Sequence, residues 1–498
     1  MIPELGIELP VLLSAVVALL VLLKFHQWIR VWSNLPPMPV RPYPIVGHFP
    51  YLKGDIREKM LGFRKTTGDI FSMYFGGTLV VVLSSYEILT EALIKQADAF
   101  SARPLDGPIA VVGYTEGILG STGQQWKENR TVTLSVFKKF GMGNNILAEK
   151  ILEELKFYLD KLVSLKGEPS YIGNMTSCAI SNVICNIVVG RRFEYDDSEY
   201  GKFIETSDRI MRMLGGGFLH QWYPKLKYLP GDFFKAKALI QVDKQFMDGM
   251  RNFIERVIRE EQDGSNKDNL ISEYLNEMRK RQETGKQTEL SMKSLERVVF
   301  ELMIAGIETT ASGFLWFSLY MLHNPQVQRK IYEEIVSEIG TNRAPTLEDK
   351  SRLKYTNAAI AESLRLASLV PWAGFHRCSS ETVIQGYTIP KDTMVLPSLD
   401  SVLLDEAIWG DPRNFRPERF LKDGELVIPQ HFVSFSMGRR FCIGAKLAKL
   451  EMFLFVASVI QKFEILPAEP GSLPPRQYRM GATCPPQPFR LRLVERCV

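Results

Sequence analysis

Several patterns that would assign a function at once are absent from this sequence of 498 residues. No CxxC pair occurs among its six scattered cysteines, so zinc-type spacing is missing and a disulfide framework is not expected in so long a chain. The 61 basic and 56 acidic residues leave a net charge of only +5, too small and too dispersed for a nucleic-acid-binding surface. No repeat, low-complexity tract or Gly/Ser-rich linker stands out. We therefore expect one large domain behind an N-terminal extension.

The extension holds an apolar run, Leu9–Leu23, that acidic residues precede and basic residues follow. Its 15 residues are fewer than the ~20 that usually cross a bilayer, but counting from Leu5 gives 19, enough for a thin membrane. The alternative, a cleaved signal peptide, needs a basic leading segment that is missing here. The flanking charges favour an uncleaved signal anchor over residues 1–30, with the rest of the chain in the cytosol.

A proline-rich stretch at residues 31–50 follows the anchor, with five prolines between Pro36 and Pro44. Proline fixes φ and disfavours helix before it, so we expect a stiff spacer between the anchor and a body at residues 51–498. Farther along, residues 215–234 mix glycines with Trp222 and other apolar side chains. This segment either enters the membrane interface or packs as an internal loop.

Helical periodicity dominates the body. A β-branched run predicts a strand at 78–85, and residues 386–399 predict a short hairpin interrupted by proline. The longest helix would extend about 50 Å if unbroken, and Asn324-Pro325 would cap and start the next one. Helices are predicted at 145–165, 176–190, 234–261, 265–282, 291–323, 325–339, 355–368 and 443–462. The fold class is therefore mainly α with a minor β-sheet.

One cysteine has a distinctive setting, in the ten residues "FSMGRRFCIG" (435–444) before the last of these helices. Gly438 permits a turn that a larger residue would strain, and Gly444 lets a flat ligand approach the backbone. Cys442 stands at the mouth of the helix, where free N–H groups and the helix dipole lower a thiol pKa. We therefore expect a thiolate, the form that ligates iron, with Arg440 able to reach an anionic group beside it.

The pattern F-x-x-G-x-R-x-C-x-G resembles the haem-ligand loop of the cytochrome P-450 family, the haem-thiolate monooxygenases. The resemblance implies the cytochrome P-450 fold, a single large haem domain, and haem b (iron protoporphyrin IX) as the cofactor. It makes Cys442 the proximal iron ligand and Arg440 a partner of a haem propionate. Ala445 is a departure, because many members carry an acid there.

The longest predicted helix contains "AGIETT" (305–310). Gly306 weakens the helix locally and Thr309 can turn its hydroxyl to the backbone, which would leave a groove for water and dioxygen. Alone, such a pair most simply marks a kink without chemistry. Beside the cysteine loop it is similar to the oxygen-activation motif of the family, which implies that Glu308 and Thr309 relay protons.

Four further residues are assigned to the haem propionates by the resemblance. Trp126 and Arg130 in "WKENR" are four apart on one helical face, and both can donate to one anion. His376 in "GFHRC" and Arg103 in "FSARP" match positions that contact propionates in similar proteins.

A second charged group is assigned to folding and to support of the haem loop. Glu362 and Arg365 lie one helical turn apart, which alone is most often a solvated surface pair. With Arg419 of "FRPERF" they resemble the structural triad of the family.

The resemblance covers essentially the whole chain, and "NVICNIVVGRRFEYDD" (182–197) is most similar to family 2 of the microsomal members. It implies a monooxygenase of the EC 1.14 type, in the endoplasmic reticulum membrane with the catalytic domain on the cytoplasmic side. The substrate would be a fatty acid, steroid or xenobiotic. Pocket positions are expected near 105–119, 302–305, 370–372 and 480–482.

An electron donor is also implied, since no GxGxxG follows a strand and no second domain is present to bind a nicotinamide or flavin. The expected partner resembles NADPH–cytochrome P-450 reductase, with cytochrome b5 as a further candidate. A set of basic residues is either its docking face or solvated surface: Lys127, Lys138, Lys139, Lys446 and Lys449. A haem-thiolate isomerase and a non-catalytic haem protein are the alternatives; the acid–threonine pair at 308–309 and the basic residues favour the monooxygenase.

Overall fold

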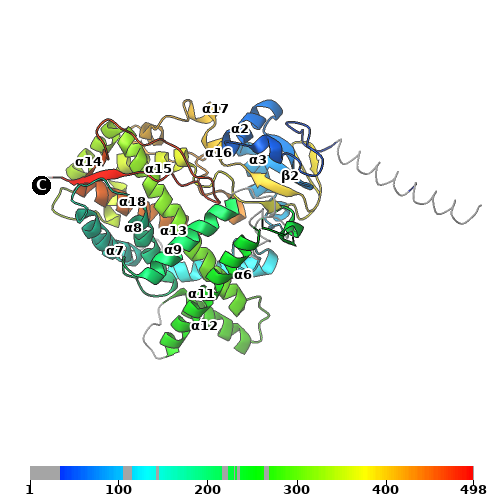
Figure 1. Cartoon of the computed structure of the whole chain (residues 1–498), viewed down its shortest axis with the longest axis horizontal. Coiled ribbons are helices and arrows are strands. Elements are labelled where there is room, and N and C mark those ends of the chain that lie inside the picture. Colours follow the sequence, from blue (N-terminus) through cyan, green and yellow to red (C-terminus); the bar gives the residue numbers. More distant parts are fainter. Residues whose placement is uncertain are drawn as a thin grey trace, which may run out of the picture.

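The computed structural model describes residue 19 and residues 34–104, 115–141, 145–215, 222–228, 230–232, 236–262 and 269–496. Within these residues the chain is mainly helical, with small sheets, as the sequence predicts (Figure 1). The predicted anchor, apart from residue 19, lies outside the described residues, as do residues 105–114 and part of 215–234.

All eight predicted helices are present, with ends shifted by a few residues. The larger helices are α2 (Ile56–Thr67), α6 (Gly123–Lys139), α7 (Asn145–Val163), α8 (Gly173–Val188), α9 (Ser198–Gly215), α11 (Ala236–Gln262), α12 (Leu270–Glu283), α13 (Met292–His323), α14 (Pro325–Glu338), α15 (Lys354–Ala367) and α18 (Ala445–Lys462). Short helices are α3 (Tyr86–Thr90), α4 (Ala97–Phe100), α16 (Asp400–Leu403) and α17 (Glu406–Trp409). One-turn 3₁₀ or π segments are η1 (Phe49–Leu52), η2 (Glu91–Lys95), η3 (Pro224–Tyr228), η4 (Leu347–Ser351), η5 (Pro417–Phe420) and η6 (Gly438–Arg440).

Helix α13 passes through the middle of the body and packs against α8, α15 and α18 (Figure 1). The Ser291 hydroxyl caps its start by accepting a hydrogen bond from the Ser294 N–H at 3.1 Å. Among the described helices α13 alone is long and apolar enough to span a membrane, but 78% of its apolar window is buried inside the protein. It is therefore the core helix around which the others pack.

The boundary between α13 and α14 differs in one detail from the prediction. Pro325 begins α14 as expected, but the side chain of Asn324 makes no N-cap hydrogen bond to that helix. Its Nδ2 donates instead to the Tyr320 carbonyl at 2.8 Å, and so satisfies a free carbonyl at the end of α13.

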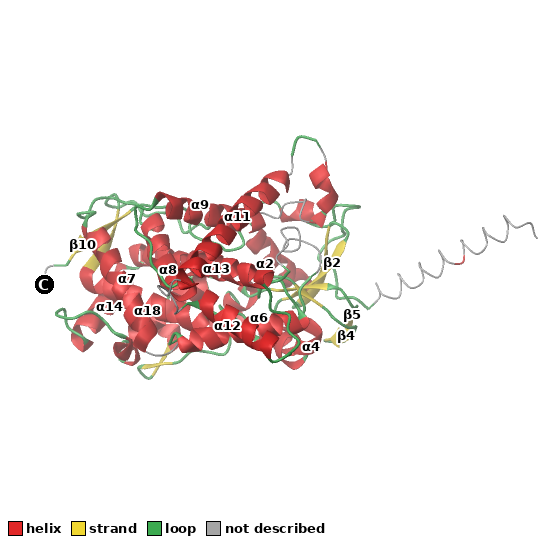
Figure 2. Ribbon diagram, turned by 90° about the horizontal axis from the view of Figure 1, so that it is seen from below, coloured by secondary structure: helices red, strands yellow, loops and turns green. Residues whose placement is uncertain are grey.

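The strands lie mainly at one edge of the body, around β2, β4 and β5, while β10 lies at the opposite end (Figure 2). The largest sheet has the order β1-β2-β6-β3, with β2 and β6 parallel and the other two pairs antiparallel. The strands are β1 (Ile70–Phe75), β2 (Thr78–Leu83), β3 (His376–Arg377), β4 (Thr382–Ile384), β5 (Tyr387–Ile389), β6 (Met394–Pro397), β7 (Leu421–Lys422), β8 (Glu425–Leu426), β9 (Phe463–Pro467) and β10 (Leu491–Glu495). The predicted strand at 78–85 is confirmed as β2.

The predicted hairpin at 386–399 is wrong. Its two strands, β5 and β6, do not pair with each other: β5 pairs with β4, and β6 lies between β2 and β3. The tight turn that does form is at Gln385 and Gly386, which both have positive φ (50° and 82°). The true hairpin therefore begins upstream of the predicted one.

Candidate functional site

The cysteine loop turns sharply before α18. Ser436 and Gly438 both have positive φ (62° and 70°), and a Cβ on Gly438 would collide with the carbonyl oxygen of Leu93. Glycine is therefore required there for close packing as well as for backbone conformation. The Cys442 N–H donates to the Phe435 carbonyl at 3.1 Å, which closes the loop and presents the cysteine just before α18.

The side chain of Cys442 is accessible and lines a cavity of about 290 Å³. The surrounding protein raises the pKa of this thiol by burial, although the N–H groups of Gly444 and Ala445 and the charges of Arg130 and Lys449 oppose that shift. The N–H groups at the helix mouth thus favour the thiolate as expected, but in the absence of iron the desolvation of the anion outweighs them. The other described cysteines are buried and free, as expected.

Two arginines line the same cavity, Arg103, which is buried, and Arg440, which is partly buried, and the nearby charge of Glu301 acts on both. Arg440 donates to the carbonyls of Ser101, Ile118 and Ser121 at 2.9, 2.9 and 2.6 Å. Burial and the neighbouring charges of Arg103 and Arg130 lower the pKa of Arg440 to about 8. Burial also lowers the pKa of Arg103 to about 10. Neither forms an ion pair within the described part of the chain.

Two neutral nitrogens near these arginines have no partner. The indole Nε1 of Trp126 is buried and unbonded, and its ring lies 4.4 Å from the Arg440 guanidinium carbon. In His376, Nδ1 lies 2.6 Å from the Phe100 carbonyl, whereas the buried Nε2 has no partner. Burial, with the charges of Arg103 and Arg440, lowers the pKa of this imidazole well below its usual value. Trp126 lines the cavity; His376 does not.

The residues around the cavity fit a haem. Guanidiniums that form no ion pair within the described residues, with the unbonded indole N–H of Trp126 beside them, suit an anionic group such as a propionate. Arg130 also lines the cavity and donates to the Phe441 carbonyl at 2.8 Å. A Cβ on Gly444 would meet no protein atom within 4 Å, so the backbone is open to a flat ligand. An accessible cysteine in the same wall supplies a soft donor for iron.

Helix α13 forms another wall of the same cavity through Ala305, Gly306, Thr309 and Thr310. The Thr309 hydroxyl donates to the Ala305 carbonyl at 2.7 Å, as expected. Helix α13 continues without a break through Gly306. A Cβ at Gly306 would approach Ile184 to 3.2 Å, so this glycine lets α8 and α13 pack closely.

The side chain of Glu308 does not line the Cys442 cavity. Its Oε1 accepts a hydrogen bond from the Thr483 hydroxyl at 3.3 Å. Burial and the charge of Asp208 raise the pKa of Glu308 to about 7, against the opposing charges of Arg479 and Arg212. The structure therefore brings Thr309 to the cavity but not its acidic neighbour.

Two buried acids that the sequence analysis did not select adjoin the site. Glu451 lines the Cys442 cavity; burial raises its pKa to about 8, against an opposing hydrogen bond with Thr310. Glu301 accepts from the backbone N–H groups of Ile118 at 2.5 Å and Leu119 at 2.9 Å. Both interrupt apolar runs ("VVFELM" and "KLEMFLF"), which is the signal that could have identified them.

Glu301 connects to the arginines through the short loop 117–121. Its carboxylate holds two N–H groups of the loop, whose carbonyls hold Arg440 and, at Leu119, the Nε of Arg103 at 3.0 Å. A Cβ on Gly117 would collide with the carboxylate, so only glycine lets the loop approach so closely.

A second, larger cavity of about 500 Å³ adjoins the first, since Leu119 and Ala305 line both. Trp372 and the segment Met480–Ala482 also line it, as expected for pocket residues. Its walls are otherwise mostly apolar. A lipophilic molecule held there would end next to the wall that carries Thr309.

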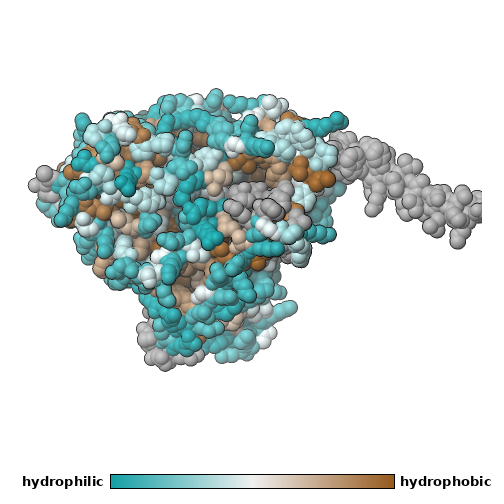
Figure 3. Space-filling model, in the orientation of Figure 1, coloured by the Kyte–Doolittle hydropathy of each residue, from teal (hydrophilic) through white to brown (hydrophobic). Residues whose placement is uncertain are grey.

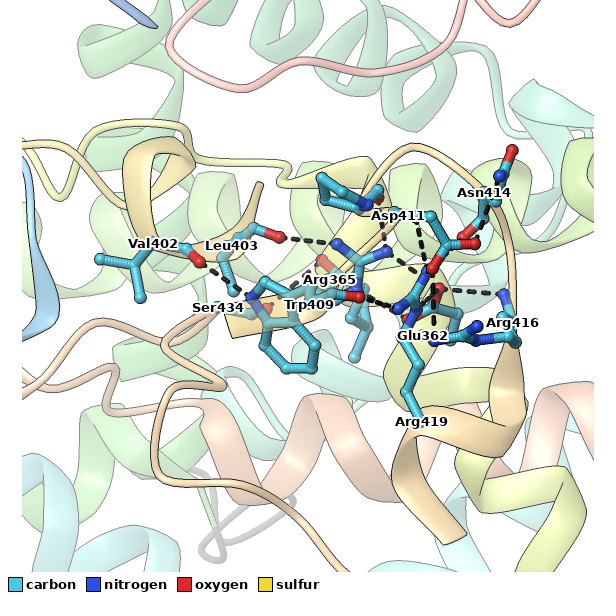
Figure 4. A network of polar contacts seen from close by, with 12 residues as sticks. Glu362, Arg365, Val402, Leu403, Trp409, Asp411, Asn414, Arg416, Arg419 and Ser434 are labelled. Atoms are coloured by element: carbon cyan, nitrogen blue, oxygen red, sulfur yellow. Dashed lines mark hydrogen bonds and ion pairs between the residues drawn. The ribbon is translucent and has the colours of Figure 1, made fainter. Parts of the chain in front are cut away.

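The charged triad lies apart from both cavities and is fully paired (Figure 4). Glu362 and Arg365 have no exposed surface, and their bidentate bonds measure 2.7 and 2.9 Å. Arg365 also donates to the carbonyls of Leu403 and Pro412, and Arg419 reaches Glu362 at 3.2 Å. The Ser434 hydroxyl donates to the Leu364 carbonyl at 3.3 Å, which ties the segment before the cysteine loop to α15.

The five basic residues considered for docking are all exposed. Lys127, Lys138 and Lys139 are on α6, and Lys139 is ion-paired with Glu273. Lys446 and Lys449 are on the first turns of α18, and the Lys449 ammonium lies 5.1 Å from the centre of the Phe435 ring. Lys446 and Lys449 thus belong to the helix that directly follows the cysteine loop in the sequence.

Comparison with known proteins gives a family match. The model of the family described as "Cytochrome P450" matches residues 36–493. Cytochrome P450 2U1 of Homo sapiens is 35% identical over 494 residues, covering 93% of this chain and 90% of that protein. Cytochrome P450 18a1 of Drosophila melanogaster is 31% identical, over 97% and 92% of the two chains. Cytochrome P450 2C23 of Rattus norvegicus is 32% identical, over 97% and 98%.

Proposed function

The chain belongs to the cytochrome P450 family, and we propose that it inserts one oxygen atom of dioxygen into a lipophilic small molecule at the endoplasmic reticulum membrane. The family makes it a haem-dependent monooxygenase, similar to microsomal members of family 2. The proposed domains are an anchor at 1–30, a proline-rich hinge at 31–50 and the haem domain at 51–498.

We assign the proximal iron ligand to Cys442. The observation that carries this is the accessible thiol in the wall of a cavity whose other walls hold the guanidiniums of Arg103, Arg130 and Arg440, which form no ion pair within the described residues. Metal binding requires the deprotonated sulfur, so iron must overcome the raised pKa of the thiol, helped by the N–H groups of Gly444 and Ala445. When bound, haem supplies the reductive activation of dioxygen.

The carboxylates of the haem would be held by Arg103, Trp126, Arg130, His376 and Arg440. The arginines and the Trp126 indole supply N–H donors, and the indole N–H has no partner among the described residues. His376 can donate from Nε2 only as an imidazolium, because its Nδ1 already donates to the Phe100 carbonyl. Charge-assisted bonds to a buried guanidinium are the strong class of hydrogen bond. A dianionic ligand would therefore supply the counter-charge that this cluster receives only in part from Glu301.

Thr309 is proposed to hold and pass protons at the cavity wall. Its hydroxyl donates to the Ala305 carbonyl, so its oxygen can still accept a proton or a hydrogen bond from the cavity side. Glu308 would exchange protons with the outside, since its pKa of about 7 lets it act as both acid and base near neutral pH. Because Glu308 faces Thr483, a side-chain rotation or water must connect the two.

Electrons are proposed to come from NADPH through a flavoprotein reductase that docks on the exposed lysines of α6 and α18, with cytochrome b5 as a further donor. Lys446 and Lys449 support this, because they lie on the helix that follows Cys442. An acidic partner surface would be attracted to that side of the protein.

Contact with membrane lipid is proposed on the side of β2. The face in Figure 3 is largely polar, but hydrophobic residues gather on that side. Ile45 is 80% exposed and Tyr228 76% exposed. The Tyr223 hydroxyl donates to the Ile45 carbonyl, which joins the hinge to the described part of the 215–234 segment.

The test is Cys442→Ser in the full-length, haem-loaded chain. The parent should show the thiolate absorption band of its carbon-monoxide complex and oxidise lipophilic substrates only with reductase and NADPH. The variant should lose both, whereas Cys378→Ser, at a buried cysteine outside the cavity, should keep both. Retention of the band in Cys442→Ser would exclude the ligand assignment, and product formed without reductase would favour an isomerase.

A further inference from the structure

A buried asparagine stands between two of the residues proposed to bind the propionates. Asn129 lies on α6, three residues after Trp126 and directly before Arg130, and it has no exposed surface. Asparagine is a poor helix former, and burying its amide is costly unless the polar atoms are bonded. Asn129 lines neither of the two cavities, so it can act on a ligand there only through other residues.

The amide of Asn129 joins α6 to α12 and to the loop 117–121. Its Nδ2 donates to the carbonyls of Glu116 and Gly117 at 2.9 and 3.2 Å, and its Oδ1 accepts from the Tyr274 hydroxyl at 2.6 Å. Because the two carbonyls can only accept, one orientation of the amide alone satisfies all three bonds. Tyr274 is completely buried on α12. Helix α12 thereby fixes the direction in which a side chain of α6 holds the loop.

These bonds hold the peptide unit between Gly117 and Ile118 from both sides. Its carbonyl accepts from Asn129, and its N–H donates to the Glu301 carboxylate at 2.5 Å. The Ser121 hydroxyl donates to the same carbonyl. A peptide unit is planar, so one that is bonded on both sides resists rotation. The peptide unit that follows it in the loop is therefore fixed in direction as well.

The following peptide unit carries an acceptor of Arg440. The Ile118 carbonyl accepts from Nη1 of Arg440 at 2.9 Å, and the Ser121 carbonyl accepts from Nη2 at 2.6 Å. A further bond runs from Nε to the Ser101 carbonyl at 2.9 Å. A guanidinium has five N–H donors in a rigid plane, so the carbonyls that hold three of them also aim the remaining N–H groups.

We propose that Asn129 and Tyr274 are positioning residues for Arg440: they fix the loop 117–121 so that the remaining N–H groups of this guanidinium face a haem propionate. This inference rests on the proposed haem-binding function and adds to it two residues that line neither cavity. The alternative is a purely structural role, in which the same bonds hold α6 and α12 together without any effect on the propionate. The charge of the propionate distinguishes the two roles.

The experiment measures the rate at which the full-length, haem-loaded chain in detergent loses its haem to an excess of apomyoglobin. It is done with haem and with haem dimethyl ester, whose propionates are esterified and carry no charge. Asn129→Leu removes the amide at similar volume and should speed the loss of haem about tenfold, and Tyr274→Phe, which removes one hydrogen bond, about threefold. Neither variant should speed the loss of the dimethyl ester, because Arg440 has no anion to bind there.

Two further variants test the specificity of the effect. Tyr158→Phe removes another buried hydroxyl, bonded to that of Thr176 at 2.7 Å, at a position that lines neither cavity, and should match the parent with both haems. In the Arg440→Met background, Asn129→Leu should have no further effect, because the arginine that it positions is gone.

The reduction potential of the haem is a second readout. It should fall in Asn129→Leu and not in Tyr158→Phe, because a propionate charge that is less compensated favours ferric over ferrous iron.

The outcomes separate this inference from the proposed function. If Asn129→Leu speeds the loss of both haems equally, or of neither, the positioning role is overturned while the haem protein stands. A further effect of Asn129→Leu in the Arg440→Met background also overturns it. If Arg440→Met keeps haem as well as the parent does, the propionate assignment fails first. If the purified parent holds no haem, the proposed function fails, and the positioning role with it.

Discussion

Two groups of buried charge in this protein are built on opposite principles. In the triad of α15 and η5, Glu362 meets two guanidiniums, and the remaining donors of Arg365 meet carbonyls (Figure 4). Around the Cys442 cavity, the buried Arg103 and the partly buried Arg440 donate, among the described residues, only to backbone carbonyls, and Glu301 acts on them without an ion pair. Complete pairing marks a group that holds the fold, and missing counter-charge marks a group that receives a ligand.

Two buried carboxyl groups, those of Glu362 and Glu451, show the same contrast between a paired and an unpaired charge. Glu362 and Glu451 are both buried, but Glu451 faces the hydroxyl of Thr310 instead of a guanidinium. Burial therefore raises the pKa of Glu451, because nothing of opposite charge stabilises its anion. Glu362 and Glu451 are buried to nearly the same depth, but only Glu451 lines the Cys442 cavity. Their surroundings, and not their burial, therefore account for the difference.

The largest effect on stability is expected from Arg365→Met, which removes one member of the charged triad. Removing one member leaves Glu362 as a buried charge with a single partner, which costs about 3–5 kcal/mol and should sharply reduce folded, haem-loaded protein. The measurement is the urea midpoint, with yield of the haem complex as a second readout. The double variant Glu362→Gln with Arg365→Met should recover part of the loss; an unchanged midpoint in the single variant would show that the triad is dispensable.

The second-largest effect is expected at the arginines beside the Cys442 cavity, and it can be measured in the absence of iron. Arg440→Met should weaken binding of metal-free protoporphyrin IX by about ten- to a hundredfold, the worth of a charge-assisted hydrogen bond to a carboxylate. The measurement is a fluorescence titration of the haem-free chain. Cys442→Ser should bind the metal-free porphyrin as the parent does, because sulfur contacts only the metal. Equal affinity in Arg440→Met and the parent would remove Arg440 from the propionate site.

A third prediction concerns pH and Glu451. Its folded-state pKa of about 8 exceeds the ordinary 4.5, so between these values the folded chain holds a proton that the unfolded chain has lost. Stability contributed by this group is therefore full below about pH 4.5 and falls as pH rises toward 8, by at most about 1.4 kcal/mol per pH unit. Glu451→Gln should flatten that fall in urea midpoints, whereas Glu153→Gln, on the exposed face of α7, should not.

The smallest effect on stability, about 0.5–1.5 kcal/mol for one hydrogen bond, is expected from Thr309→Ala. The haem should be retained, but coupling should fall, so that more NADPH is consumed and more hydrogen peroxide released for each product formed. The ratio of product to NADPH measures this. Thr309→Ser keeps the hydroxyl and should restore coupling; full coupling in the alanine variant would contradict the proton-relay role.

Local patterns were enough for much of this protein. The turn at Gly438, the cysteine before α18 and the threonine of α13 all depend on residues within one or two turns of each other, so spacing alone predicts them. Eight of the eleven larger helices described were predicted for the same reason, because each repeats its apolar positions over several turns, whereas α2, α6 and α9 were not predicted by range. Contacts between residues that are far apart in the sequence were harder to predict. Glu301 and Glu451 could be recognised in the sequence only as acids inside apolar runs.

The sequence by itself determined the family, the fold class and the cysteine loop, since each follows from short-range spacing of residue types. Only the tertiary structure decided that Glu308 faces Thr483, that β6 joins β2 instead of β5, and that Arg103 and Arg440 form no ion pair within the described residues. The physical reason is that pairing, desolvation and direction of a side chain depend on segments hundreds of residues apart, such as loop 117–121 and Glu301. The charge that this packing leaves only partly compensated supports the proposal that the cavity of Cys442 receives an anionic ligand.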